Sequence, residues 1–239
     1  MYLFNENILT VILVIIGGAI VIFAQTKINS SYSKYKKVAC KKGISGCEVA
    51  RLILDTNGLT NVHVVETTGE LSDHYDPKRQ VVRLSKDIFH GTSIASVSVA
   101  AHECGHAIQD KENYKFMRIR SALVPVVNLV SYLGYFASIF GIVIGVLGYL
   151  KIGILVLFVT VLFQLVTLPV EFDASNRAKE QLEKLMLVQP DEAKGVSKML
   201  SAAAFTYVAS LISSLLNLLR LILVFRDRDN WFISFFMII

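Results

Sequence analysis

Residues 122–170 read ALVPVVNLVSYLGYFASIFGIVIGVLGYLKIGILVLFVTVLFQLVTLPV, and Lys151 is their single charged residue. A helix needs about 20 mostly apolar residues to cross the hydrocarbon core of a bilayer. Because the stretch is more than twice that long, it predicts two membrane-spanning helices that form a hairpin. A hairpin returns the chain to the side from which it started. The residues before 122 and after 170 are therefore expected on the same side of the membrane.

Two further stretches are long and apolar enough to span. Residues 8–24 carry no charge, and residues 199–225 carry only Arg220. The last run, residues 231–239, is too short to cross as a helix and is expected to lie in the membrane interface. Hydrophobic residues make up 54% of the chain, and the mean hydropathy is +0.54. The chain is thus predicted to be a mainly α-helical membrane protein with about four transmembrane helices.

Charges around the first span predict its orientation. The residues before it include Glu6 but no Lys or Arg, and no small-x-small cleavage site follows it, so an uncleaved anchor is favoured over a signal peptide. Lysines accumulate directly after the span, at Lys27, Lys34, Lys36, Lys37, Lys41 and Lys42. The positive-inside rule therefore predicts a multi-pass protein of the cell membrane, with its N-terminus outside and residues 27–120 and 171–202 in the cytoplasm.

The same lysines would suggest a nucleic-acid partner in a soluble protein. Beside a membrane span they are better explained by topology and by attraction to anionic lipid. We therefore expect the lipid bilayer as a partner and no nucleic acid. The three cysteines, Cys40, Cys47 and Cys104, are an odd set without a CxxC spacing, which predicts free thiols in a reducing compartment.

The motif His102-Glu103-Cys104-Gly105-His106 places two histidines four residues apart. On a helix such residues share a face, where both imidazoles can bind one metal ion. Zinc suits this arrangement, because an open coordination position on Zn²⁺ lowers the pKa of a bound water to about 7. Glu103 is placed to take the proton of that water, whereas Cys104 turns away from the metal face and is expected in the core. The pattern predicts Zn²⁺ as the cofactor.

Residues 27–120 are expected to form a small α+β unit that carries the zinc helix. Ser45 and Glu48 fit a capping box at the start of a helix that Asn57-Gly58 would end. The elements expected after this helix are a strand at 62–65, a turn at 73–77, a strand at 81–84 and the zinc helix over 93–109, with Ser93 or Thr92 as its cap.

A catalytic zinc needs a third protein ligand. Glu171 is the carboxylate at the cytoplasmic end of the predicted third span, where the hairpin returns the chain to the side of His102. The residues that follow have a helical pattern, so Glu171 is expected to begin a helix that continues out of the membrane. The chain is then divided into an N-terminal anchor (1–26), the zinc-helix domain (27–120), the hairpin (121–170), a cytoplasmic helical segment (171–202) and a C-terminal span with its apolar tail (203–239).

Four stretches carry a family resemblance. Residues 100–107 (AAHECGHA) and 168–178 (LPVEFDASNRA), together with 73–77 (DHYDP) and 83–85 (RLS), resemble the YugP-type membrane zinc metallopeptidases. The resemblance extends from about Ser45 to the fourth helix. More distantly, the layout is similar to the HtpX-type membrane proteases and to the gluzincins, in which two histidines and a downstream glutamate bind zinc.

The resemblance implies that this zinc domain, placed in the cytoplasm by its charges, is gluzincin-like, with His102, His106 and Glu171 as ligands and Glu103 as the general base or acid. One departure concerns the position four residues after the ligand glutamate. Gluzincins commonly place there an Asp that orients the first histidine, whereas this chain has Ser175. Asp173 lies nearby, and the partner of each histidine stays open at this point.

Several other residues are candidates for supporting roles. His74, Tyr75 and Arg177 are candidates for stabilising the oxyanion that develops during hydrolysis, although an ordinary turn histidine is the alternative for His74. His63 is expected on the solvent side of a strand and His90 in a loop, so neither is expected to bind metal.

These observations predict a membrane-bound zinc metalloendopeptidase that acts at the cytoplasmic membrane surface. Its expected partners are protein or peptide substrates, membrane proteins among them, and its oligomeric state stays open. Residues 81–84 could align an extended substrate if they form an edge strand. Intramembrane proteolysis is one alternative, but it would require the zinc helix to be a span. The other alternative is a non-catalytic zinc-binding scaffold or sensor, which would tolerate loss of Glu103.

Overall fold

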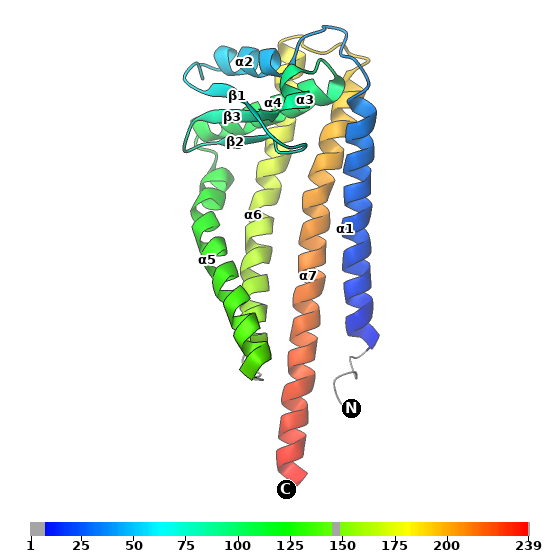
Figure 1. Cartoon of the computed structure of the whole chain (residues 1–239), viewed down its shortest axis with the longest axis vertical. Helices are drawn as coiled ribbons and strands as arrows, with labels where there is room; N and C mark the ends of the chain where they lie inside the picture. Colours follow the sequence, from blue (N-terminus) through cyan, green and yellow to red (C-terminus); the bar gives the residue numbers. More distant parts are fainter. Residues whose placement is uncertain (1–7, 145–148, 239) are drawn as a thin grey trace. The chain divides into compact units, whose positions relative to one another are not determined.

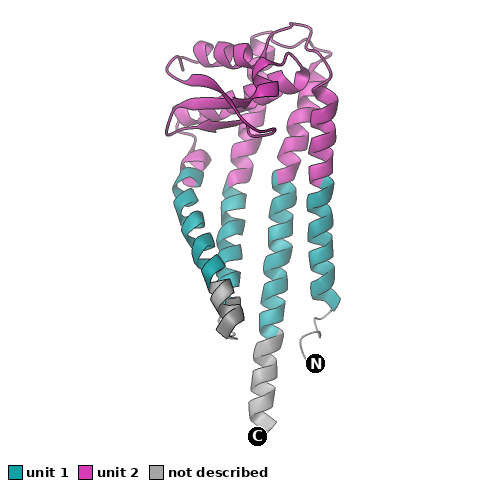
Figure 2. Ribbon diagram, in the orientation of Figure 1, with its two compact units in different colours: residues 1–23, 120–166, 207–239 teal, residues 24–119, 167–206 magenta. Residues whose placement is uncertain are grey.

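The computed structural model describes residues 8–144 and 149–238 (Figure 1). The elements in chain order are α1 (Ile8–Tyr35), α2 (Gly46–Thr56), β1 (His63–Thr67), β2 (His74–Asp76), β3 (Val81–Ser85), α3 (Lys86–His90), α4 (Ile94–Lys111), α5 (Lys115–Ile144), α6 (Tyr149–Lys184) and α7 (Ala193–Ile238). Two compact units result (Figure 2). We call residues 1–23, 120–166 and 207–239 the span unit, and residues 24–119 and 167–206 the sheet unit.

Four helices of the described residues are long and apolar enough to cross a membrane: Ile8–Tyr35, Lys115–Phe136, Lys151–Lys184 and Ala193–Arg226. In each of them at most 22% of the most apolar window is buried within the protein. Such a large exposed apolar surface is unfavourable in water, whereas lipid tails accommodate it. The prediction of a mostly helical chain with four candidate membrane spans is confirmed.

The apolar run 122–170 forms the expected pair of helices, α5 and α6, and the residues that join them, 145–148, lie outside the described part of the chain. Lys151 lies within α6. Residues 231–238 continue α7 as one helix, and the expectation that this run lies in the membrane interface stays a prediction. No Pro or Gly follows Gly195, so nothing in the sequence interrupts the helix. Ile239 is outside the described residues.

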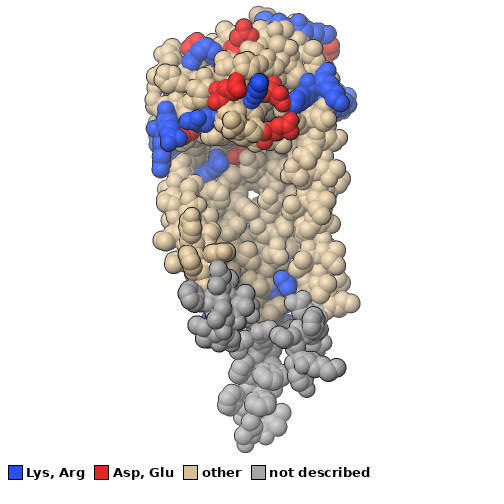
Figure 3. Space-filling view, viewed as in Figure 1, with Lys and Arg blue, Asp and Glu red and all other residues tan. Residues whose placement is uncertain are grey.

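Charged side chains distribute unequally between the units. On the face shown in Figure 3, Lys, Arg, Asp and Glu gather over the sheet unit, and the described side chains of the span unit are almost all uncharged. This is the distribution expected when one unit meets water and the other meets lipid.

The sheet has three strands in the order β1-β3-β2. β3 pairs with β1 in parallel and with β2 in antiparallel orientation. Four of the five residues of β3 are buried, which explains the apolar content of this central strand. The prediction of strands near 62–65 and 81–84 is confirmed, but β3 is not an edge strand. The edge of the sheet beside β3 is formed by β2.

The prediction of a turn over residues 73–77 is wrong for its middle part, since His74–Asp76 is strand β2. The reversal comes later, at residues 77–80. Pro77 has no amide hydrogen and cannot continue the ladder, and the Asp76 carboxylate accepts hydrogen bonds from the backbone amides of Lys78 (3.0 Å) and Arg79 (3.2 Å).

The helices of the sheet unit begin where the capping residues predict. At α2 the Ser45 hydroxyl accepts from the Glu48 amide (3.2 Å), and the Glu48 carboxylate accepts from the Ser45 amide (2.7 Å), so the capping box is confirmed. At α4 the Ser93 hydroxyl accepts from the Ser96 amide (3.1 Å). The short helix α3 was not predicted.

The core of the sheet unit brings α4 close to α2 and α6. Cys104 is fully buried, and its thiol donates to the Ala50 carbonyl of α2 (3.5 Å). On the α6 side, a Cβ atom at Gly105 would come within 2.5 Å of the Ala174 carbonyl, so only glycine permits this approach. All three cysteines are free, as expected.

Glu171 does not begin a helix, contrary to the prediction. α6 is continuous from Tyr149 to Lys184 and includes Pro169 and Glu171 in its interior. A single helix therefore contains both an apolar segment and the glutamate that faces α4.

Candidate metal centre

His102 and His106 lie on one face of α4, as their spacing predicts. Their ring centroids are 4.8 Å apart, and the ring planes are nearly perpendicular, at 82°. His106 is buried and His102 is partly buried. Both rings direct Nε2 toward the same neighbour, Glu171 of α6.

Glu171 completes a group of three ligand-type side chains. Its Oε2 lies 3.3 Å from Nε2 of His102 and 3.6 Å from Nε2 of His106. Among the described residues, this is the group of His, Cys, Asp and Glu side chains that could hold a metal ion, with ligand atoms within 4.8 Å of one another. Glu171 is buried, with 2% of its surface exposed, so its charge requires cationic or hydrogen-bonding partners.

The distances within this group suit zinc. Two ligand atoms on one tetrahedral Zn²⁺, each about 2.0–2.2 Å from the metal, are about 3.3 Å apart. Two imidazole nitrogens and one carboxylate oxygen are the ligand set of many catalytic zinc sites, in which a fourth position stays open. The donor chemistry and the spacing therefore both fit zinc.

The far nitrogen of each histidine has a polar partner. Nδ1 of His102 lies 3.2 Å from the Ser175 hydroxyl, four residues after Glu171 on α6. Nδ1 of His106 lies 3.0 Å from Oε1 of Gln109. Ser175 thus contacts the histidine that an Asp orients in gluzincins, which answers the question left open by the sequence.

Gln109 escaped the sequence analysis. The spacing could have predicted its contact with His106, because residues three apart on a helix are neighbours and Gln109 follows His106 by three. The sequence does not show which groups of α6 the Gln109 amide contacts. The Nε2 group of Gln109 donates to two oxygen atoms of α6.

Glu103 lies beside the metal group and is buried, with 7% of its surface exposed. Burial raises the pKa of Glu103 to about 7, with His102 opposing the rise and Glu171 reinforcing it. The backbone amide of Tyr75, on strand β2, lies close enough to the Glu103 carboxylate to lower its pKa slightly. A carboxyl with such a pKa can both accept and release a proton near neutral pH.

The remaining predicted site residues have other contacts. Arg177 donates to Asp173 (2.6 Å) and to Glu112 (2.7 Å), and its guanidinium lies 6.0 Å from the centre of the Tyr114 ring. These contacts tie α6 to the C-terminal end of α4 and give Arg177 a positioning role.

His74 and Tyr75 both lie on β2. His74 is exposed, and its Nδ1 lies 2.8 Å from the Ser72 carbonyl. The Tyr75 hydroxyl donates to Asp110 (3.0 Å), and burial together with that carboxylate raises the pKa of the phenol. Neither side chain belongs to the metal group, whereas the main chain of Tyr75 contacts Glu103. His63 is exposed, and His90 pairs with Glu66 (2.7 Å).

Asp73 is a further residue that the sequence analysis missed. It is partly buried, and one carboxylate oxygen accepts from the amide (2.7 Å) and the hydroxyl (3.0 Å) of Ser85. Burial raises the pKa of Asp73, and the hydrogen bonds from Ser85 oppose the rise. These bonds fix the start of β2 against the end of β3, which positions the strand that contacts Glu103.

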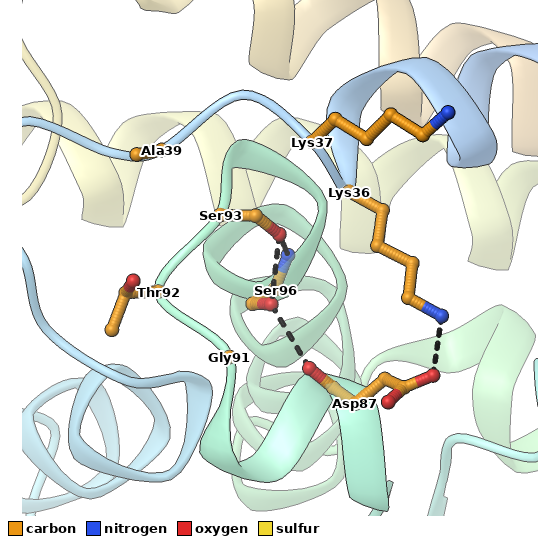
Figure 4. A pocket seen from close by; sticks show the side chains of 8 residues that line it. All are labelled: Lys36, Lys37, Ala39, Asp87, Gly91, Thr92, Ser93 and Ser96. Carbon is orange, nitrogen blue, oxygen red and sulfur yellow. Dashed lines mark hydrogen bonds and ion pairs between the residues drawn. The ribbon is translucent and has the colours of Figure 1, made fainter.

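A cavity of about 300 Å³ lies at the other end of α4 (Figure 4). Its lining includes Lys36, Asp87, Ser93 and Ser96 but none of the metal-group residues. Lys36 reaches across it to pair with Asp87, and the two serines bond to each other (2.9 Å) as part of the helix cap. This cavity is a packing feature of the α4 N-terminus and is separate from the metal group.

Comparison with known proteins agrees with the site. Residues 10–226 match the family described as "Putative neutral zinc metallopeptidase". The chain belongs to this family. The membership confirms the resemblance found in the sequence and identifies Zn²⁺ as the cofactor, for which His102, His106 and Glu171 form a suitable group.

A relative from Bacillus subtilis (strain 168), described as "Putative membrane protease YugP", is 46% identical over 209 residues. The match covers 87% of this chain and 93% of the relative. No solved structure matches the chain. With the four apolar helices, this relationship supports a multi-pass membrane protein of the zinc metallopeptidase family.

Proposed function

We propose that the protein is a membrane-bound zinc metalloendopeptidase whose active site lies at the cytoplasmic surface of the membrane. The observation that carries the proposal is the convergence of His102, His106 and Glu171, with the buried carboxyl of Glu103 next to them. A purely structural zinc site has four protein ligands, whereas three ligands leave a position for water.

His102, His106 and Glu171 would hold the metal, and Glu103 would handle the proton. When bound, zinc polarises the scissile carbonyl and makes the attacking water more acidic. Glu103 takes a proton from this water during the attack and then donates it to the leaving amine. The raised pKa of Glu103 suits both steps, and no covalent intermediate with the protein is needed.

Strand β2 is the element that we propose to align an extended substrate. β3 cannot do so, because β1 and β2 occupy both of its edges. β2 pairs with β3 on one side only, and the backbone amide of its Tyr75 lies near the Glu103 carboxylate. A peptide added along the free edge would therefore run past the general base.

Chemistry outside the bilayer is favoured over intramembrane cleavage. Cleavage within the membrane would need the zinc helix itself to span, and α4 is not among the candidate spans found in the described residues. α4 instead packs against α2, α3 and the strands β2 and β3 of the sheet unit. We therefore propose protein or peptide substrates, membrane proteins among them, that present a segment at the cytoplasmic surface.

Zinc-dependent hydrolysis by the purified protein tests the proposed function. The detergent-purified chain is expected to contain one zinc and to cleave casein, because the ligand group and the base are both in place. A strong chelator should abolish cleavage, and stoichiometric Zn²⁺ should restore it. A protein that holds its zinc but cleaves neither casein nor membrane-derived peptides would instead support a scaffold or sensor.

Cysteine labelling tests the orientation. Ser33→Cys and Lys184→Cys are expected to resist a membrane-impermeant maleimide in intact cells and to react after permeabilisation, because both exposed positions lie on the predicted cytoplasmic side. Asn5→Cys, before the first span, is the control that should react in intact cells. The unmutated chain reports any reaction of Cys40, Cys47 and Cys104. Labelling of position 33 or 184 from outside would reverse the topology.

A further inference from the structure

The side chain of Gln109 makes three polar contacts next to the metal group. This side chain is completely buried, and each of its two polar atoms is engaged. Oε1 lies 3.0 Å from Nδ1 of His106, while Nε2 donates to the Val170 carbonyl and to the Asp173 carboxylate, both at 2.8 Å. A buried amide with partners at both ends has one orientation.

These contacts assign donor and acceptor unambiguously. Val170 O and Asp173 Oδ2 can only accept, so the atom of Gln109 that faces them must be the NH₂ group. The carbonyl oxygen of the amide therefore faces His106, where it can only accept. It follows that Nδ1 of His106 carries the hydrogen, which leaves the lone pair on Nε2, the atom 3.6 Å from Glu171.

The same amide connects the two helices of the metal group. Val170 and Asp173 flank Glu171 on α6, at one residue before it and two residues after it. Asp173 is in turn held by Arg177 (2.6 Å). A movement of α6 that displaced Glu171 would therefore also displace the acceptors that orient Gln109.

His102 lacks an equivalent constraint. Its Nδ1 contacts the Ser175 hydroxyl at 3.2 Å, and a hydroxyl can rotate and either donate or accept. The two histidines thus differ in how firmly they are oriented, because an amide with three partners is fixed and a single hydroxyl is not.

We propose that Gln109 is a positioning residue that selects the metal-binding tautomer of His106 and couples its orientation to the segment of α6 that carries Glu171. This inference rests on the proposed zinc site and adds a determinant of metal affinity outside the ligands. Histidine ligands held in this way commonly lose about 10–100-fold in metal affinity when the supporting partner is removed.

Zinc affinity of the full-length, detergent-purified protein tests the inference, measured by competition with a chromophoric chelator. Gln109→Leu is expected to weaken zinc binding about 10–100-fold. The matched control is Gln181→Leu, which removes another buried glutamine of the sheet unit, one that accepts from Asn57 (2.9 Å) and lies ten residues beyond Glu171 on α6. In the metal-free form, this control should lose about as much thermal stability as Gln109→Leu. It should nevertheless bind zinc like the wild type.

Two Asp173 variants extend the test if Gln109→Leu does not fold. Asp173→Ala removes one acceptor of the amide and should weaken zinc binding by a smaller factor. Asp173→Asn keeps an acceptor oxygen toward Gln109 and Arg177 and should restore affinity. The spectrum of the Co²⁺-loaded protein should change in Gln109→Leu or Asp173→Ala, whichever variant folds, and not in Gln181→Leu.

The outcomes distinguish a failure of the positioning role from a failure of the proposed zinc site. Wild-type affinity in Gln109→Leu, or equal losses of affinity in Gln109→Leu and Gln181→Leu, would overturn the positioning role while leaving the zinc site intact. Unchanged zinc binding by His106→Ala would instead remove the ligand assignment, and the positioning role with it.

Discussion

Replacement of Glu103 by glutamine is expected to lower kcat/KM for peptide hydrolysis by at least about 10²-fold while zinc stays bound. The amide keeps the size of the side chain but cannot take a proton from water at neutral pH. Residue 103 does not belong to the ligand group formed by His102, His106 and Glu171, so zinc binding should be preserved. Parallel measurement of casein cleavage and zinc content separates chemistry from metal binding.

At high pH, the metal-free Glu103→Gln variant is expected to be more stable than the metal-free wild type. The pKa of Glu103 is raised from 4.5 to about 7 in the folded protein, so the folded state disfavours the charged form. The resulting destabilisation is absent below pH about 4.5 and develops as the pH rises to about 7. Glu103→Gln removes it and should stabilise the metal-free protein at pH 8 by about 3 kcal/mol.

Thermal unfolding at pH 4.5 and pH 8 measures this difference. A higher Tm of Glu103→Gln at pH 8 only, together with lost turnover, would show that the inactive variant is folded. Equal cleavage by wild type and Glu103→Gln, with zinc present in both, would rule out the proposed mechanism.

Removal of any one of the three ligands is expected to have the largest effect on metal content. His102→Ala, His106→Ala and Glu171→Gln should each lose zinc during dialysis against a mild chelator and lose activity with it. The reason is that two remaining ligands bind zinc far more weakly than three.

Glu192 provides a matched control for Glu171. It is also a buried glutamate of the sheet unit, but it accepts hydrogen bonds from the amides of Lys41 and Gln189, both at 2.7 Å. Glu192→Gln should lower stability without loss of zinc. Full zinc occupancy in His106→Ala or Glu171→Gln after dialysis would show that the ligand assignment is wrong.

Much of the fold was predictable because its signals are local. Apolar runs such as residues 8–24 predict spans through their length and composition alone. The Ser45–Glu48 capping box and the Ser93 cap satisfy backbone groups within three residues of themselves. The failures occurred at β2 and at Glu171, where the outcome depended on a strand partner or on the continuation of a helix.

The sequence by itself determined the membrane spans, the zinc chemistry and the shared helical face of His102 and His106. These properties follow from composition and from a periodicity of 3.6 residues, which needs no knowledge of distant segments. Only the tertiary structure decided that Ser175 and Gln109 contact the two histidines, that the Tyr75 amide lies near Glu103 and that β2 is the edge strand beside the site. Hydrogen bonds between α4, α6 and β2 join residues up to 73 positions apart, and their partners are selected by how these elements pack.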